Sequence, residues 1–348
     1  MIQEGQLIYA KTKGMIPIEE LKIGDSVYTG EGHFAKVINI RKKEHRGITT
    51  TLEYFRYNIP LICDNEQLIL IHNDEVGHPF WQPVHRILPN DLICMPKPQF
   101  IKDTRILPVK KAYSSNPRYK DVPKKIELSK QLLELFGTYL AEGCCSLHDT
   151  KGKFISISGH TREMPLLERI AYFIQEVFGV NSTIYKCSSA ESGIELRAYS
   201  IDLALWFSNL FEQGAKNKRI PDVLMELSPK KLLYLSNSYI SGDGYRRKNQ
   251  AEFTTVSSEL GYQMILIFLK SGLIPNLRKN KKYNVSHWVG GYTLEGLPSN
   301  SKLNMQDQYF VYHPVKSVSN YKQKKKAFSL QLESVDSVVV GQCTLRTR

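Results

Sequence analysis

The chain has 348 residues, 42% of them hydrophobic, and its 47 Lys and Arg outnumber 34 Asp and Glu to give a formal net charge of +13. This length and apolar content exclude a disordered tail and predict two or three domains with real cores. No apolar run is as long as a membrane-spanning helix and the start lacks a signal-peptide pattern, so we expect an unsecreted, intracellular protein with no membrane partner.

The basic residues form clusters that favour a polyanionic partner. A single cluster is typical of a solvated face, but five of them with this net excess favour nucleic acid over a membrane surface. The six cysteines include no CxxC pair and have no histidines at zinc spacing, so we expect buried thiols in a reducing compartment. The clusters are RKK at 41–43, KNKR at 216–219, RRK at 246–248, RKNKK at 278–282 and KQKKK at 322–326.

Residues 1–96 consist of short strand-like runs separated by turn residues, which predicts a β-rich region. Residues 97–126 are rich in Pro, Lys and Arg and include Lys110 and Lys111. This stretch is either a linker or a basic arm that contacts DNA.

From residue 127 the periodicity alternates between helix and strand. One series of elements fills 127–215, a second series in the same order fills 216–304, and strand-like runs return at 305–348. An internal repeat of about a hundred residues is the main organisational feature. It predicts a repeated module inserted into a split β domain. Helices are predicted at 130–143, 165–179, 201–211, 228–244 and 257–272, and strands at 151–159, 182–189, 193–200, 245–256 and 276–294.

The helices that open the two series share one pattern at their ends. The first reads LFGTYLAEG and the second SNSYISGDG, so each has two small residues four apart, then an acid, then glycine. Residues four apart lie on one helical face, and small ones let another backbone approach closely. The final glycine suits a left-handed position at the helix end. The small residues are Gly137 and Ala141 in the first helix and Ser238 and Gly242 in the second.

If these faces pack together, the acids Glu142 and Asp243 meet at the foot of the contact. Two carboxylates side by side are costly unless a positive charge lies between them. A divalent cation fits, because carboxylate oxygens are hard ligands suited to Mg²⁺. Beside a basic surface, such a site predicts hydrolysis of phosphodiesters. The alternative is that each acid only ends a turn, and the paired motifs favour the site.

This pair of motifs resembles the signature helices of the LAGLIDADG homing endonucleases, departing from them at Ser236 and Ser238, where leucine and glycine are usual. The resemblance implies an α+β fold with a pseudo-symmetric pair of αββαββα halves, each supplying one metal-binding acid. It also implies a monomer that makes a Mg²⁺-dependent double-strand break, with Mn²⁺ as a substitute and 3′ overhangs, in a long asymmetric DNA target.

A second stretch resembles the K-x-I-P segment of the intein-type members of this family. It reads KRIP and begins at Lys218, which the resemblance makes a catalytic lysine. The lysine of the second half is not clearly marked, and Lys302 is chosen by position, with Lys316 and Lys282 as alternatives.

In the family the strand pairs lie in the major groove, so basic side chains on them are candidate contacts to phosphates or base edges. Those residues are Lys186, Arg197, Arg246, Arg247, Lys248, Arg278, Lys279, Lys281 and Lys282.

The two ends of the chain read GMIPIEELKIGDSVYT at 14–29, WQPVHRILPNDLICMP at 81–96 and FSLQLESVDSVVV at 328–340. These stretches resemble a split Hint domain, the all-β fold of inteins. Splicing needs a nucleophile, a histidine and a terminal Asn, and these positions are occupied by Gln6, Gln67 and, for the closing His-Asn, Thr347 and Arg348. We therefore expect a splice-inactive domain. A second alignment places Gln342 and Cys343 at the closing junction.

The prediction is thus a site-specific homing endonuclease acting on double-stranded DNA. The alternatives are a nucleic-acid-binding, maturase-like protein without cleavage and an intein that still splices.

Overall fold

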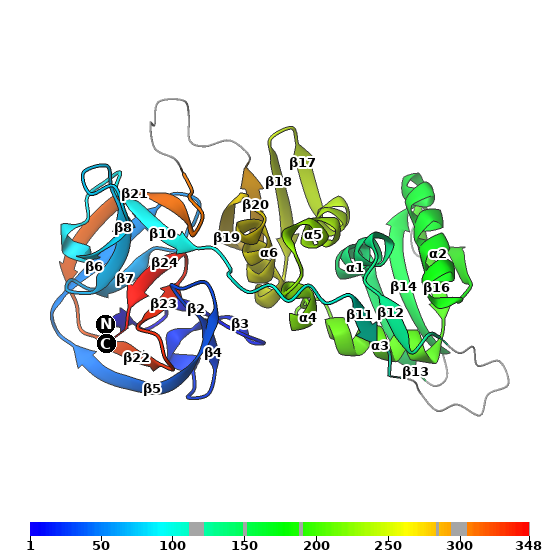
Figure 1. Ribbon diagram of the computed structural model, residues 1–348, viewed down its shortest axis with the longest axis horizontal. Helices are drawn as coiled ribbons and strands as arrows, with labels where there is room; N and C mark the ends of the chain where they lie inside the picture. Colours follow the sequence, from blue (N-terminus) through cyan, green and yellow to red (C-terminus); the bar gives the residue numbers. More distant parts are fainter. Residues whose placement is uncertain (111–121, 149–151, 188–190, 283–284, 294–304, 348) are drawn as a thin grey trace. The chain divides into compact units, whose positions relative to one another are not determined.

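The computed structural model describes residues 1–110, 122–148, 152–187, 191–282, 285–293 and 305–347. The chain has a mixed α and β fold with antiparallel sheets, and it forms two compact units, each described here by itself (Figure 1). Unit 1 comprises Met1–Phe100, Lys248–Gln250 and Thr254–Arg348, and unit 2 comprises Ile101–Arg247 and Ala251–Phe253. The five segments expected from the sequence do not coincide with these units and stay a prediction.

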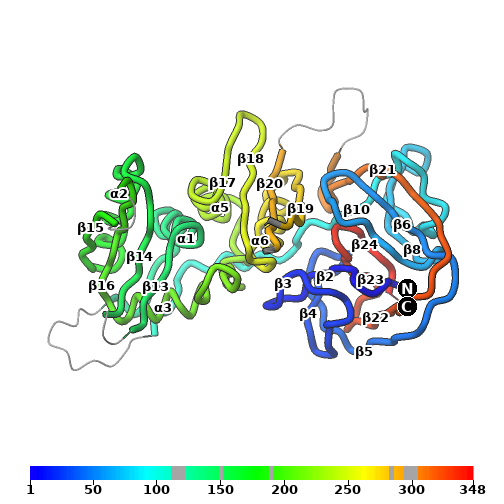
Figure 2. Tube along the Cα trace, turned by 180° about the vertical axis from the view of Figure 1, so that it is seen from behind, coloured from blue at the N-terminus to red at the C-terminus, as the bar shows by residue number. Residues whose placement is uncertain are grey.

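Unit 1 is built on a 14-stranded sheet that combines strands from both ends of the chain (Figure 2). The strands run in the order β10-β21-β6-β7-β1-β22-β5-β4-β2-β23-β24-β8-β9, with β3 beside β2 and β8 also paired to β10. Their bounds are β1 Ile2–Gln3, β2 Leu7–Ala10, β3 Gly14–Pro17, β4 Ser26–Tyr28, β5 Phe34–His45, β6 Ile48–Tyr54, β7 Leu61–Asp64, β8 Leu68–His72, β9 Phe80–Pro83, β10 Leu92–Pro96, β21 Phe310–Lys322, β22 Lys325–Leu332, β23 Ser337–Val340 and β24 Cys343–Arg346. Two 3₁₀ turns, η1 (Ile18–Glu20) and η2 (Val84–Arg86), connect strands.

Unit 1 also contains helix α6 (Ser258–Lys270), which is buried along most of its length. The Ser257 hydroxyl caps its first turn by accepting from the Leu260 amide. The Tyr9 hydroxyl donates to the Glu259 carboxylate at 2.9 Å, and the Tyr9 and Tyr262 rings stack at 4.4 Å. Through these contacts α6 packs against β2, near the start of the chain.

Unit 2 contains the first helix-and-strand series around a four-stranded antiparallel sheet ordered β13-β14-β16-β15. Its strands are β13 Gly143–His148, β14 Gly152–His160, β15 Ser182–Lys186 and β16 Gly193–Tyr199, and the pair β11 (Ile106–Pro108) and β12 (Lys125–Glu127) precedes them. Its helices are α1 Lys130–Glu142, the turn η3 Thr161–Glu163, α2 Met164–Phe178, α3 Ile201–Phe211, α4 Asp222–Met225 and α5 Pro229–Asp243. The short helix α4 was not expected from the sequence.

The second series repeats the strand order of the first. Strands β17 (Gly244–Arg247), β18 (Gln250–Thr255), β20 (Val285–Thr293) and β19 (Ile274–Lys282) are ordered β17-β18-β20-β19, so in both sheets the fourth strand lies between the second and the third. Strand β18 contributes residues to both units. The repeat predicted from the sequence is therefore present in the strand order, and a two-fold symmetry between the halves stays a prediction.

An aromatic cluster fixes α1 in the core of unit 2. The Phe136 ring lies 5.0 to 5.7 Å from the rings of Phe211, Phe207 and Trp206 on α3, and the Tyr139 ring lies 4.7 Å from Phe207. Phe136 and Tyr139, three residues apart on one face of α1, thus pack against the aromatic rings of α3. Within the part of the chain that the structure describes, no helix is long and apolar enough to cross a membrane.

Candidate active site

Helices α1 and α5 pack so closely at Gly137 that a side chain would not fit there. A Cβ atom at this glycine would collide with the Leu235 carbonyl oxygen and would lie 2.7 Å from Ser238 Cβ and 2.9 Å from the Tyr239 amide nitrogen. Real Cβ atoms essentially never come under 3.0 Å to such neighbours. The two helices therefore touch backbone to backbone at this position.

Hydrogen bonds between hydroxyl and carbonyl groups also link the facing sides of α1 and α5. The Thr138 and Ser238 hydroxyls lie 2.9 Å apart, and the Ser238 hydroxyl donates to the Glu134 carbonyl at 2.8 Å. Ser238 stands where the resembled family has glycine, and its side chain finds partners on α1 instead of separating the helices.

One turn further along, Gly242 of α5 faces the end of α1. A Cβ atom there would lie 2.7 Å from Ala141 Cβ, 3.2 Å from Glu142 Cγ and 3.5 Å from Glu142 Oε1. The Glu142 side chain therefore rests against the residue that directly precedes Asp243. The two acids, each the last residue of its helix, lie at the same end of the helix pair.

The expected left-handed glycines at these helix ends are wrong. Gly143 has φ −90° and Gly244 has φ −141°, both extended, because the chain passes directly from each helix into β13 or β17. Glycine is needed there for space. A Cβ at Gly143 would lie 2.6 Å from the Tyr139 carbonyl oxygen, and one at Gly244 would lie 2.6 Å from the Ile240 carbonyl oxygen. The two cysteines after Gly143, Cys144 and Cys145, lie in β13.

Lys218 reaches the carboxyl end of α1. Its ammonium group donates to the carbonyls of Tyr139, Leu140 and Ala141 at 3.2, 2.9 and 3.3 Å. A cation at this end of a helix is favourable, because the last carbonyls lack partners and carry the negative end of the dipole. The same ammonium group interacts electrostatically with both Glu142 and Asp243.

Burial and neighbouring carboxylates raise the pKa values of both acids, with Glu142 acting on Asp243 and Glu163 acting on Glu142. Burial and, after it, the Glu142 charge raise the pKa of Asp243 to about 6, against the lowering effect of Lys218 and the Tyr239 hydroxyl. Burial and the Glu163 carboxylate raise the pKa of Glu142, although much of that side chain is exposed, and Lys218 again opposes. Burial lowers the pKa of Lys218, against the effect of Asp243.

This donor set suits Mg²⁺ or a similar hard cation. Such a cation is typically held by one or two carboxylates, with water and substrate phosphate as its other ligands. Glu142 and Asp243 supply two carboxylates whose pKa values are raised by burial first and by a neighbouring carboxylate second, so a bound cation would stabilise their charged forms. In the described residues no group of three or more His, Cys, Asp and Glu is arranged to hold a metal, so a cation here would depend on these two acids and on substrate.

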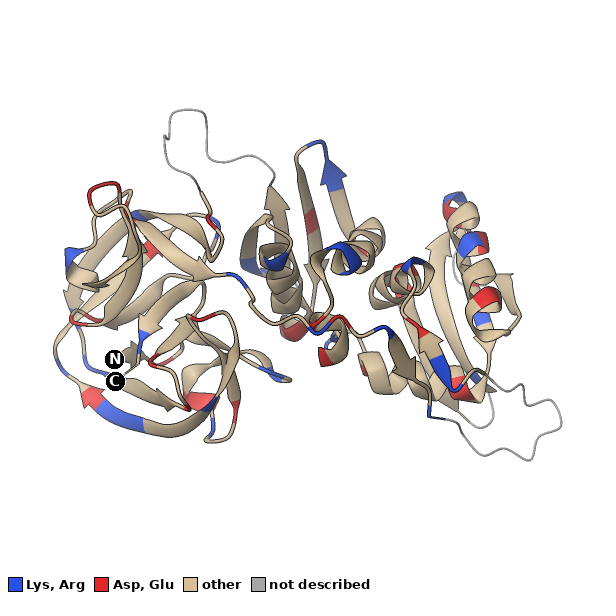
Figure 3. Cartoon of the chain, in the orientation of Figure 1, with Lys and Arg blue, Asp and Glu red and all other residues tan. Residues whose placement is uncertain are grey.

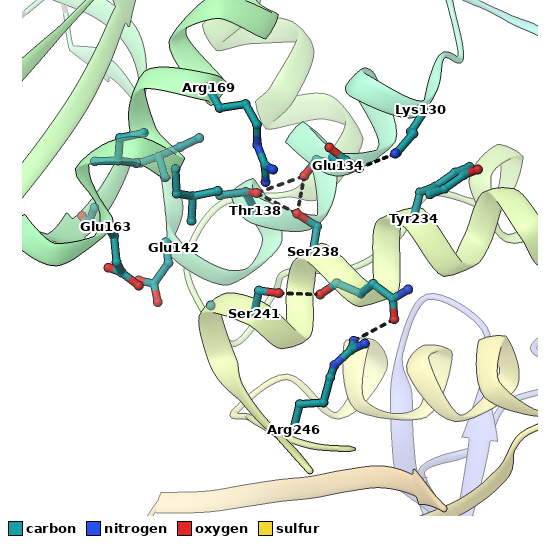
Figure 4. A pocket seen from close by; sticks show the side chains of 16 residues that line it. Lys130, Glu134, Thr138, Glu142, Glu163, Arg169, Tyr234, Ser238, Ser241 and Arg246 are labelled. Carbon is teal, nitrogen blue, oxygen red and sulfur yellow. Dashed lines mark hydrogen bonds and ion pairs between the residues drawn. The ribbon is translucent and has the colours of Figure 1, made fainter. Parts of the chain in front are cut away.

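A pocket of about 400 Å³ lies beside the helix pair and includes Glu142 in its wall. The Glu163 carboxylate points toward that of Glu142 (Figure 4). Glu163 also accepts from the His160 amide at 2.7 Å and so caps the turn before α2. The sequence analysis missed Glu163, and the only available signal was its spacing from His160, which is that of a helix-capping pair with an unusual first residue.

The DNA-contact candidates of unit 2 lie on exposed or half-exposed strand positions. Arg197 forms two hydrogen bonds to Glu195, Arg246 donates to the Asn237 amide oxygen and Arg247 donates to the Tyr245 hydroxyl. These local bonds hold the guanidinium groups in place at the sheet. Lys186 on β15 and Lys110 after β11 are exposed.

Apart from Lys111, the remaining basic candidates, for DNA contact and for the second catalytic lysine, belong to unit 1. Lys248 follows β17, and the exposed residues Arg278, Lys279 and Lys281 lie on β19. Lys316, an alternative for the second lysine, pairs with Glu53 at 3.6 Å on the large sheet. Lys282 ends β19, and its side chain is outside the description. Lys302 and Lys111 lie outside the described residues.

The proposed splicing positions of unit 1 are only partly brought together. The Gln67 side chain accepts from the Met1 amine at 2.8 Å and donates to the Arg346 carbonyl at 2.8 Å, next to Thr347. The Gln6 side chain accepts from the Ile62 amide at 3.0 Å, and Gln6 lines the same small pocket as Gly341. The alternative junction, Gln342 and Cys343, lies in the core, where the Gln342 amide donates to the Tyr54 hydroxyl. Arg348 is outside the described residues.

No family model matches this chain. Over 306 residues it is 27% identical to "Uncharacterized protein MJ0043" of Methanocaldococcus jannaschii, a match that covers 78% of this chain and 37% of that protein. It is 25% identical over 316 residues to "ATP-dependent DNA helicase Hel308" of Thermococcus kodakarensis, covering 78% of this chain and 28% of the helicase. The chain thus spans about a third of the length of these two relatives.

Similar solved structures include homing endonucleases. I-DmoI in complex with DNA and Mn has a TM-score of 0.38 and 12% identity, over 48% of this chain and 92% of that one. I-WcaI bound to its DNA recognition sequence has a TM-score of 0.32 and 20% identity, over 47% and 76%. The N-terminal LAGLIDADG domain of DUF199/WhiA has a TM-score of 0.31 and 12% identity, over 47% and 76%.

Proposed function

We propose that this chain is a site-specific DNA endonuclease of the LAGLIDADG homing type that requires a divalent cation. One observation carries the proposal: the two signature helices touch backbone to backbone at Gly137, and this contact leaves Glu142 and Asp243 at one end of the pair, both with raised pKa values. If each acid only ended its helix, the close helix contacts at Gly137 and Gly242 would have no role in bringing the two acids together.

Glu142 and Asp243 hold the cation, and Mg²⁺ is its natural identity, with Mn²⁺ as a substitute. When bound, the cation activates water and neutralises the charge that develops on the phosphate. The protein's own groups then have separate tasks. The carboxylates of Glu142 and Asp243 would hold the cation and so fix where a phosphate of the substrate can bind it. Lys218 holds the end of α1, and so the backbone that carries Glu142, in place.

The substrate is double-stranded DNA with a long asymmetric site, cut in both strands to leave 3′ overhangs. Lys186, Arg197, Arg246 and Arg247 supply positive charge on unit 2 for the phosphate backbone. Both signature helices belong to one polypeptide, so the active form is a monomer, and it acts inside the cell at DNA.

The β part of unit 1 is a Hint-like domain that no longer splices. Gln67 carries an amide where an imidazole would protonate the scissile bond, and both ends of that amide already bond to Met1 and Arg346. A fusion of the chain between two reporter segments tests this directly. The ligated reporter should not form, and its appearance would favour the intein alternative.

Cleavage is tested with purified protein, Mg²⁺ and a library of randomised duplex targets, sequenced after ligation of adaptors to new ends. We expect one enriched cut site for wild type and none for Glu142→Gln or Asp243→Asn, with unchanged melting temperatures. Specific binding without cutting by all three proteins would favour the maturase-like alternative. Identical cutting by all three would refute the assigned acids.

A further inference from the structure

Asp243 has a buried tyrosine one turn before it on its own helix. Between Lys231, near the start of α5, and Asp243, its last residue, the helix carries only uncharged side chains (Figure 3). Tyr239 is four residues before Asp243, and residues four apart lie on the same face of a helix. Side chains on a helix lean toward its N-terminus, so the Asp243 carboxylate extends back over the turn that contains Tyr239.

The Tyr239 side chain has a fixed position. Tyr239 is fully buried, and its ring packs edge-on against Phe253 of β18, with 5.7 Å between the ring centroids. Its backbone lies at the closest contact of the two signature helices, because a Cβ atom at Gly137 would come within 2.9 Å of the Tyr239 amide nitrogen. The contact with α1 and the packing of the ring thus fix where the phenol hydroxyl lies.

This hydroxyl acts on Asp243 by hydrogen bonding. Burial raises the pKa of Asp243, and the hydrogen bond from Tyr239 lowers it. An ionised carboxylate can only accept hydrogen bonds, so the tyrosine O–H is the donor. A buried tyrosine hydroxyl usually has such a partner. One carboxylate oxygen of Asp243 can accept from Tyr239 while the other stays available as a ligand.

Glu142 lacks comparable support. Within the described part of the chain, no hydroxyl or amide group donates to the Glu142 carboxylate, and its side chain is exposed. The neighbouring groups Glu163 and Lys218 act on it through their charges. Of the two acids, Asp243 is therefore the one whose orientation the protein fixes, and Glu142 is the one that can adjust.

We propose that Tyr239 is a positioning residue of the cation site, which holds the Asp243 carboxylate in the orientation that binds the cation. The inference rests on the proposed function, because it concerns the cation that Glu142 and Asp243 share. Ligating carboxylates are themselves hydrogen-bonded in metal sites, and loss of the group behind a ligand typically weakens metal affinity by about 10- to 100-fold. Tyr239 is that group for Asp243.

The test measures Mn²⁺ affinity of the full chain without DNA, by electron paramagnetic resonance of the free ion. The variant Tyr239→Phe keeps the packed ring and removes only the hydroxyl. The matched control is Tyr139→Phe, which removes the hydroxyl of the buried tyrosine on α1, whose hydrogen-bond partner is the Cys145 thiol. Asp243→Asn is the reference that shows whether the measured ion occupies the proposed site.

We expect Tyr239→Phe to weaken Mn²⁺ binding by about tenfold or more, with a melting temperature close to that of wild type. Tyr139→Phe should bind Mn²⁺ as wild type does, and Asp243→Asn should lose at least as much affinity as Tyr239→Phe. Unchanged affinity in Tyr239→Phe would overturn the inference while leaving the cation site intact. Equal losses in the two tyrosine variants would also overturn it, because both would then act by loosening the helix pair.

A different result would reach the proposed function itself. If wild type bound no Mn²⁺, or if Asp243→Asn bound it as tightly as wild type, Asp243 would not be a cation ligand. Both the cation site and the positioning role of Tyr239 would then be refuted.

Discussion

The two signature helices share one motif but are built differently. Helix α1 buries eight of its 13 residues, among them a continuous run from Leu135 to Leu140, whereas α5 buries five of its 15. Helix α1 contributes a glycine at the closest contact, and α5 contributes the Ser238 hydroxyl there. At this closest contact, α1 therefore supplies the space and α5 supplies a hydroxyl that donates a hydrogen bond back to α1.

The helix ends differ as well. At the end of α1, Lys218 caps the carbonyls, and Glu142 stays largely exposed. At the end of α5, Asp243 is more enclosed, and its pKa rises to about 6. The paired acids are thus not equivalent. Asp243 is the one whose charge costs more in the absence of a cation.

The largest expected effect comes from neutralising either acid. Glu142→Gln and Asp243→Asn should each lower the double-strand cleavage rate by about 10³-fold, as loss of a key charge-stabilising group does in other enzymes. Single-turnover cleavage of the identified target measures this. Glu134→Gln, on the same face of α1, is the control and should stay within a few-fold of wild type. A variant acid that keeps full activity would show that the two helix ends do not form one site.

Gly137→Ala tests the backbone contact between the helices. The added methyl must displace the α5 backbone, so we expect a loss of about 2 kcal/mol in the free energy of unfolding, even though alanine favours helix over glycine. Urea titration followed by circular dichroism measures it. Gln131→Ala, at an exposed position of the same helix, should change the free energy by less than about 0.5 kcal/mol. Equal stability of the Gly137→Ala variant would mean that α1 and α5 can separate freely.

Lys218→Met tests whether this residue positions the helix end. Because the variant loses three hydrogen bonds to the last carbonyls of α1, we expect its free energy of unfolding to fall by about 1 to 2 kcal/mol. The substitution should also raise the pKa of Asp243 further, because Lys218 opposes that rise. Lys218→Arg should restore part of both. If the methionine variant lost cleavage with neither change, Lys218 would act on substrate instead.

The smallest expected effect is the pH dependence of cation binding. The pKa of Asp243 is raised from 3.8 to about 6, so the protonated form stabilises the folded state below pH 3.8, and this contribution is lost as pH rises through about 6. A cation binds only the carboxylate, so its affinity should rise by up to about tenfold per pH unit below 6 and level off above it.

Calorimetric titration with Mn²⁺ between about pH 5 and pH 7.5 follows this change across the window of the shift. Asp243→Asn should remove the dependence. Glu142→Gln should move its midpoint to lower pH, because the Glu142 charge is one cause of the raised pKa. A flat profile for wild type would separate cation binding from Asp243.

Much of the site could be predicted from short sequence patterns because each pattern has a local physical cause. Small residues four apart, followed by an acid and a glycine, marked both helix ends, and the structure places those residues at the α1–α5 contact. The same reasoning failed for the conformation of Gly143. A left-handed turn is the usual reason for glycine after a helix, and it holds for Gly179, with φ +66°. At Gly143 crowding by Tyr139 is the reason, and no local pattern reveals a neighbour's ring.

The sequence by itself determined the element types, the repeated order of helices and strands, and the positions of the two acids, since periodicity and spacing are local properties. Only the tertiary structure decided three further points. It placed Lys218 on the carbonyls of α1, brought Glu163 to Glu142, and set the start of β22 beside the end of β5, with Lys325 opposite His45. Each of these depends on residues distant in the chain, and their pairing follows from packing and strand register, which the sequence does not display.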